Sequence, residues 1–190
     1  ASSSFAGWSG GGCSGTGSCT VTMSGAQSVT ATFNLLPEVF PVGCAVPAGW
    51  TTPVGATAGW AVASDRKRTG SCSLKSNPIA SSGTNGVFTK AQIQAAGTFA
   101  AGNLSFYYNV SSEAGWDCLR LLVDGVQRAE VGSTCTNTGG AGASGDISTW
   151  TLVTVPVTAG AHTFTWSYEK DYTVDSGIDA AWIDDVVTAA

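Results

Sequence analysis

Five side chains of this sequence offer the chemistry that recognises sugars. Aromatic rings pack on the apolar faces of pyranoses, and polar groups beside them hydrogen-bond the hydroxyls. Tyr107 and Arg120 are predicted to lie on strand faces that point away from the core, and three more aromatic residues lie in or beside predicted loops. We therefore expect one ligand-binding platform composed of Tyr107, Trp116, Arg120, Trp150 and Tyr172.

A second group of side chains could bind a cation. Six of the 13 acidic residues lie between positions 169 and 185, with Lys170 among them. Calcium takes six to eight oxygen ligands from carboxylates, carbonyls and water, and loops can supply such a set. The alternative is a solvated acidic loop that keeps the protein soluble. The six acids are Glu169, Asp171, Asp175, Asp179, Asp184 and Asp185.

Catalytic groups are harder to find. Asp184 and Asp185 are neighbours on a predicted strand, so they should point to opposite faces and make a poor acid and base pair. His162 is the only histidine, and it shares a predicted face with Phe164, which favours a hydrogen-bonded structural role. The sequence has no Gly-x-Ser-x-Gly elbow, no His-Glu-x-x-His and no phosphate loop. We predict that the chain is not an enzyme.

Composition indicates the fold class and excludes some partners. Charged residues make up only 11% of the 190 residues, there are 25 glycines, and Thr, Ser and Val are abundant, which is typical of an all-β chain. The net charge of −5 argues against nucleic acid, which needs clustered Lys and Arg. We expect the one basic run, Arg66-Lys67-Arg68, to be a solvated loop. The sequence contains no window of 18 apolar residues, so membrane insertion is not predicted.

The six cysteines favour disulfides over metal. Their number is even, no Cys-x-x-Cys element occurs, and only one histidine is available as a further ligand. This places the protein outside the cytosol, as a secreted and already trimmed chain that we expect to be a monomer. Six cysteines allow fifteen pairings. Proximity along the chain favours Cys13 with Cys19, Cys44 with Cys72, and Cys118 with Cys135.

The elements that must position these residues are short strands. An Asp124-Gly125 turn between two apolar runs predicts a hairpin over 116–131, and alternation predicts a strand over 103–110. Further strands are expected over 59–63, 70–76, 87–94, 162–168 and 181–187, whereas the stretch between Val131 and Trp150 is expected to be a long loop. We predict a two-sheet antiparallel sandwich whose core holds Trp60, Trp166 and Trp182.

Residues 1–36 differ from the rest and are predicted to form a small separate module. Alternating runs over 19–23 and 29–33, joined by a Ser24-Gly25 turn, predict a β-hairpin. Phe5-Ala6-Gly7-Trp8-Ser9-Gly10-Gly11-Gly12-Cys13 with these two runs resembles the second half of a bacterial surface repeat of the internalin B-repeat type, over residues 4–34. The resemblance implies that a first half precedes Ala1 in a larger modular protein, and that 35–37 is a junction.

Residues 37–190 are predicted to form the second module. Motifs over 38–187 resemble a jelly-roll module of bacterial secreted proteins, similar in layout to carbohydrate-binding modules and MAM domains; they are Ala48-Gly49-Trp50-Thr51-Thr52, Gly70-Ser71-Cys72-Ser73-Leu74-Lys75-Ser76, Val110-Ser111-Ser112-Glu113-Ala114-Gly115-Trp116-Asp117 and Ser176-Gly177-Ile178-Asp179-Ala180-Ala181-Trp182-Ile183-Asp184-Asp185-Val186. The resemblance implies a jelly-roll sandwich.

The same resemblance implies a structural calcium ion. In such modules it lies between an Asp of the last strand and an acidic residue just after the Phe of the first strand. Here the metal-site candidates are Asp184 and Asp185, but Pro41 follows the matching Phe40, which leaves Glu38 as a substitute.

Three functions remain open from the sequence. The first is a non-catalytic, bacterial, secreted module that attaches its parent protein to a polysaccharide or cell-surface glycan. The second is a spacer module of a surface adhesin or secreted protease with no ligand of its own. The third is a hydrolase domain with an unrecognised carboxylate site. Clustered exposed aromatic side chains in a groove would favour the first, and two carboxylates facing each other across a cleft would favour the third.

Overall fold

The chain forms two compact units, Ala1–Pro37 and Glu38–Ala190, in a computed structural model. The structure describes residues 3–35, 38–40, 42–136 and 140–188. The predicted junction residues Leu36 and Pro37 lie outside these ranges. Within the described residues, no helix is long and apolar enough to span a membrane.

The first unit is a three-stranded sheet. It contains β1 (Ser3–Gly10), β2 (Cys13–Gly15) and β3 (Thr30–Leu35) in the order β2-β1-β3. The predicted hairpin over 19–23 and 29–33 is wrong, because β3 pairs with β1 and residues 19–23 form no strand. Phe5 packs against Trp8 and Phe33 at centroid distances of 5.0 and 5.4 Å, so aromatic contacts between β1 and β3 stabilise this pairing.

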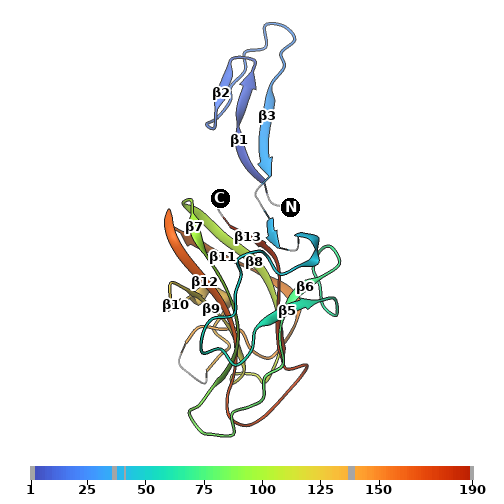
Figure 1. Cartoon of the computed structure of the whole chain (residues 1–190). Helices are drawn as coiled ribbons and strands as arrows, with labels where there is room; N and C mark the ends of the chain where they lie inside the picture. The colour runs from blue at the N-terminus through green and yellow to red at the C-terminus, as the bar shows by residue number, and fades with distance from the viewer. Residues whose placement is uncertain (1–2, 36–37, 41, 137–139, 189–190) are drawn as a thin grey trace. The chain divides into compact units, whose positions relative to one another are not determined.

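The second unit is a sandwich of two antiparallel sheets (Figure 1). The four-stranded sheet has the order β10-β9-β12-β7, with β7 (Thr89–Phe99), β9 (Cys118–Val123), β10 (Val126–Gln127) and β12 (Gly160–Lys170). The six-stranded sheet runs β11-β8-β13-β6-β5, and β4 also pairs with β13. Its strands are β4 (Glu38–Phe40), β5 (Trp60–Ala63), β6 (Ser73–Ser76), β8 (Gly102–Ser111), β11 (Asp146–Val157) and β13 (Ala180–Val187). The all-β sandwich that the sequence predicts is confirmed.

The core follows the alternation of the strands. Leu104, Phe106 and Val110 of β8 are fully buried and face the four-stranded sheet, which contributes Leu119 and Leu121. Trp166 of β12 packs edge-on against Phe106 with centroids 5.6 Å apart, and Trp50 stacks on Trp166 at 4.9 Å. Consequently, side chains at the intervening positions of β8 and β9 point out of the sandwich, from two different sheets.

The central turn and the disulfides agree with the sequence predictions, whereas the lengths of two strands do not. Asp124 and Gly125 have φ values of 53° and 78°, as the predicted turn of the hairpin requires, but the returning strand β10 is only two residues long. The predicted loop before Trp150 ends early, because β11 begins at Asp146. Cys13–Cys19, Cys44–Cys72 and Cys118–Cys135 form the three expected disulfides.

Candidate binding surface

The outer face of the six-stranded sheet carries a row of aromatic and polar side chains. Tyr107 of β8 lies opposite Leu152 of β11 and Asp184 of β13 in the strand register. One step along the strands, Asn109 lies opposite Trp182. Trp150 of the edge strand β11 lines one pocket together with Asn109 of β8, so the neighbouring strands β11, β8 and β13 place two indoles and a phenol on one surface.

A loop at residues 64–70 covers part of this face. The guanidinium carbon of Arg66 lies 4.6 Å from the ring centroid of Trp182, and the ammonium group of Lys75 lies 4.9 Å from it. The indole Nε1 of Trp182 donates a hydrogen bond of 3.1 Å to Asp65 Oδ1. Trp182 is fully buried as predicted, but beneath cations on the outer face and not in the central core.

Arg68 holds the same loop on Tyr107. Its guanidinium carbon lies 3.5 Å from the phenol centroid, and its Nη1 pairs with Asp185. The expectation that Arg66-Lys67-Arg68 is only a solvated loop is therefore wrong. Cation–π contacts fix two of the three basic residues on the sheet.

A pocket of about 370 Å³ remains beside this loop. Burial alone would raise the pKa of Asp65 on its rim, but hydrogen bonds from Lys75 and Trp182 outweigh it and hold this pKa below its ordinary value. Lys67 is exposed, and none of the salt bridges between described residues includes it. The pocket thus combines an indole, charged groups of both signs and hydroxyls: it is lined by Ser64, Asp65, Arg66, Lys67, Asn109, Ser148 and Trp150.

The five residues of the predicted platform do not come together. Tyr107 and Trp150 share the outer face of the six-stranded sheet, but Arg120 lies on β9 of the other sheet. Trp116 lies in the connection between β8 and β9 with 45% of its surface exposed, and Tyr172 lies after β12 and is half-buried. The platform is wrong as a single surface because alternation predicts which way a side chain points but not which sheet its strand joins.

Arg120 does not reach solvent. Only 3% of it is exposed, and its Nε donates a 3.1 Å hydrogen bond to Glu169 of the neighbouring strand β12. Its Nη1 donates to the carbonyl of Ala141 at 3.0 Å, because the loop after Cys135 folds over it. Gly142 makes this close approach possible, since a Cβ there would meet the Leu119 carbonyl at 3.0 Å and Arg120 Cγ at 3.3 Å.

Asp184 and Asp185, the predicted metal ligands, contact the same loop. Asp185 has a φ of 49° in an irregular part of β13, so the two carboxylates do not alternate as expected. Asp184 Oδ2 accepts backbone hydrogen bonds from Arg68 and Thr69 at 2.7 and 3.3 Å, and Asp184 Oδ1 accepts one from the Asp185 backbone. Donors occupy the positions that a cation would need, so these two residues do not fit a calcium site. The side chain of Glu38 lies outside the described residues.

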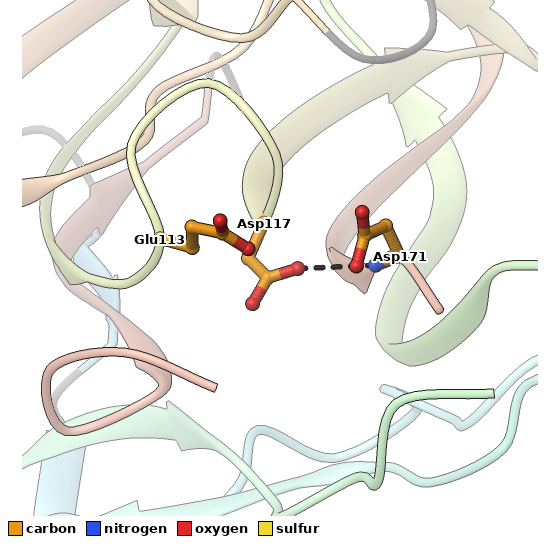
Figure 2. Close-up of side chains that lie close together, drawn as sticks. All are labelled: Glu113, Asp117 and Asp171. Atoms are coloured by element: carbon orange, nitrogen blue, oxygen red, sulfur yellow. Dashed lines mark hydrogen bonds between the residues drawn. The ribbon is translucent and has the colours of Figure 1, made fainter. Parts of the chain in front are cut away.

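A different set of carboxylates converges at one end of the sandwich (Figure 2). Glu113 and Asp117 lie in the connection between β8 and β9, and Asp171 directly follows β12. One oxygen of each lies within 4.8 Å of the others. Burial, reinforced by the nearby charges of Asp179 and Asp171, raises the pKa of Asp117 to about 7, although the Asp171 backbone N–H and the Lys170 charge oppose this.

Sequence reasoning missed most of both sites. The basic run at 66–68 was visible, but nothing local indicated that it would fold onto aromatic rings from β8 and β13. Asn109 could have been found from the alternation of β8, because it occupies the same outward phase as Tyr107. Glu113 and Asp117 lie in a sequence motif that resembles jelly-roll modules, but their partner Asp171 is 54 residues away from Asp117.

Comparison with known proteins adds a likeness of fold. No family model and no curated protein sequence matches the chain. A carbohydrate-binding module of the β-sandwich superfamily is similar with a TM-score of 0.52 and 11% identity, covering 99% of this chain and 86% of its own. The K2 cleaved adhesin domain of Lys-gingipain has a TM-score of 0.48 and 19% identity, covering 82% of this chain and 99% of its own.

A CBM22-1 xylan-binding domain from Paenibacillus barcinonensis has a TM-score of 0.39 and 16% identity, covering 75% of this chain and 88% of its own. At these identities the likeness concerns fold only, and we base it on the carbohydrate-binding module with the TM-score of 0.52. The chain is a β-sandwich similar in fold to a carbohydrate-binding module.

Proposed function

We propose that residues 38–190 are a non-catalytic module that binds a glycan on the outer face of the six-stranded sheet and so attaches a secreted protein to a polysaccharide or cell surface. The observation that carries the proposal is the pocket beside Trp150, in which a half-buried indole lies next to charged and hydroxyl-bearing side chains. The fold, shared with a carbohydrate-binding module, supports it.

The chemistry of the pocket suits a sugar ring. The indole of Trp150 offers a flat apolar surface for the C–H groups of a pyranose. Lys67 can donate to ring hydroxyls and Ser148 can both donate and accept, and both are exposed. Asp65, which the depressed pKa keeps ionised, accepts hydrogen bonds from hydroxyl groups.

The neighbouring groups give the pocket a rigid wall. Arg66 is tied to Asn109 by a hydrogen bond, to Asp146 at 3.7 Å and to the ring of Trp182, so the backbone of the loop that carries Lys67 is held from several sides. A pre-ordered wall lowers the entropy that a ligand must overcome on binding. Tyr107 supports this wall through Arg68 and does not present that ring face to a ligand.

Binding to soluble and insoluble polysaccharides tests the proposal. Pull-down on cellulose, chitin and insoluble xylan, together with a glycan array, should show retention of the whole chain on at least one of them. Trp150→Ala should reduce that retention about fivefold or more, since truncating an aromatic side chain that anchors a ligand costs more than about 1 kcal/mol.

Trp116→Ala is the matched control, because it removes an exposed indole from the connection between β8 and β9 and not from this pocket. It should leave retention unchanged. No retention on any glycan would refute the proposal and favour the spacer alternative. Loss of binding in Trp116→Ala with full binding in Trp150→Ala would place the ligand elsewhere.

A further inference from the structure

The carboxylates at the end of the sandwich have oxygen atoms with no partner. Three buried side-chain polar atoms lack a hydrogen-bond partner among the described residues, and two of them are Glu113 Oε2 and Asp117 Oδ2. Asp117 is completely buried, and only its other oxygen is used, accepting a 3.0 Å hydrogen bond from the Asp171 backbone. A buried carboxylate oxygen without a donor is costly, so this position calls for a positive partner.

The nearest lysine does not supply that partner. Lys170 is completely buried, and its ammonium group pairs with Asp175 and Asp179 in the loop between β12 and β13. No salt bridge between described residues includes Glu113, Asp117 or Asp171. The three carboxylates therefore meet without a contacting cationic side chain in the described part of the chain.

The ligand atoms suit a hard divalent cation. All three are carboxylate oxygens, with no histidine or cysteine among them, which disfavours zinc and softer metals. Oxygens bound to calcium lie about 2.3–2.6 Å from the ion, so two of them can be about 5 Å apart across it, and the observed 4.8 Å limit falls within this range. Calcium also tolerates irregular geometry and completes its shell with carbonyls and water, whereas magnesium requires a tighter octahedron.

We propose that Glu113, Asp117 and Asp171 bind a calcium ion. Such an ion would join the connection between β8 and β9 to the first residue after β12, two segments that otherwise meet here through the hydrogen bond from the Asp171 backbone to Asp117 (Figure 2). The site differs from the one that family resemblance implies at the last strand, where backbone donors and Arg68 occupy Asp184 and Asp185. It is also independent of the glycan pocket, so either proposal can fail alone.

The experiment measures thermal unfolding and calcium binding of the whole chain. After treatment with EDTA and a chelating resin, the wild type should regain one calcium ion per chain in isothermal titration calorimetry. Calcium at 100 times its dissociation constant should raise the Tm by about 5 °C or more. Magnesium at the same concentration should raise the Tm much less.

Two variants locate the ion. Asp117→Asn keeps the shape of the side chain but should bind calcium at least tenfold more weakly and lose the Tm shift. Asp185→Asn is the matched control in the alternative location, at a positive φ that asparagine tolerates, and it should keep both. If Asp117→Asn does not fold, Glu113→Gln is measured in the same way. Absence of calcium binding, equal stabilisation by magnesium, or loss of binding in Asp185→Asn alone would overturn the assignment.

Discussion

The outer faces of the two sheets both carry arginine, but they use it in opposite ways. On the four-stranded sheet, Arg120 is sealed beneath a loop and paired with Glu169. On the six-stranded sheet, Arg66 and Arg68 come from a loop and lie on aromatic rings of the strands, and Trp150 remains partly exposed beside them. The difference shows that pointing away from the core does not make a side chain available to a ligand.

The loops explain the contrast. The loop over Arg120 is anchored at its base by the Cys118–Cys135 disulfide and bonded to β9 through Leu119 and Ala143, whose backbones exchange hydrogen bonds of 2.8 and 2.9 Å. The loop over Trp182 is held mainly by side chains, which leaves a pocket at its margin. In this molecule the loop bonded through its backbone covers Arg120, whereas the loop that packs its side chains on Trp182 has a pocket at its margin.

The largest expected effect comes from disrupting the buried Arg120–Glu169 ion pair on the outer face of the four-stranded sheet. Replacing Arg120 with Met should lower the free energy of unfolding by up to about 3–5 kcal/mol, because Glu169 loses its buried partner and keeps only its pair with the partly exposed Lys90. Urea denaturation measures this. Arg128→Met is the control, since its pair with Glu130 is about one-third exposed and should contribute less than about 1 kcal/mol. Equal effects of the two substitutions would show that Arg120 is not sealed.

A second test removes the anchor of the covering loop. Changing Cys118 and Cys135 together to Ala should lower the free energy of unfolding by about 3 kcal/mol, since the bridge closes a loop of 17 residues. Denaturation monitored by circular dichroism provides the measurement. Glycan retention should persist at temperatures where this variant is folded, because the pocket lies on the other sheet. Selective loss of retention in the folded variant would contradict the separation of the two faces.

On the outer face of the six-stranded sheet, two variants with smaller effects should distinguish a residue that stabilises the loop from a residue that contacts the ligand. Arg66→Ala should lower the free energy of unfolding by about 1 kcal/mol, because it removes a cation from the ring of Trp182. Lys67→Ala should leave stability unchanged and weaken glycan retention, since its side chain lines the pocket without an ion-pair partner among the described residues. Denaturation and pull-down of both variants test this division. The reverse pattern would refute it.

The smallest expected effect concerns pH and lies away from both faces. The hydrogen bond that the Asp124 carboxylate accepts from Nδ1–H of His162, the only histidine, raises the pKa of His162 and lowers the pKa of Asp124. Because the folded pKa of His162 is raised, its contribution to stability is complete below about 6.5 and is lost as pH rises through the folded value. An NMR titration of the imidazole should show this pKa, and Asp124→Asn should bring it down. An unchanged pKa in that variant would contradict the pairing.

Prediction from sequence was accurate where the signal was local. The Asp124-Gly125 turn, the alternation of Leu104, Phe106 and Val110, and the proximity of paired cysteines each depend on residues close together in the chain. It failed for the strand over 146–157, hidden behind a Gly-rich stretch, and for the first unit, where β3 pairs with β1 and not with residues 19–23.

The sequence by itself determined that this chain is a disulfide-linked β-sandwich, because strand period, turn residues and cysteine spacing act over a few residues. Only the tertiary structure decided that Tyr107 and Arg120 belong to different sheets, that a loop seals one of them, and that Asp117 meets Asp171. The reason is physical: sheet order and loop cover depend on contacts between segments far apart in the chain, and alternation carries no information about which segments meet.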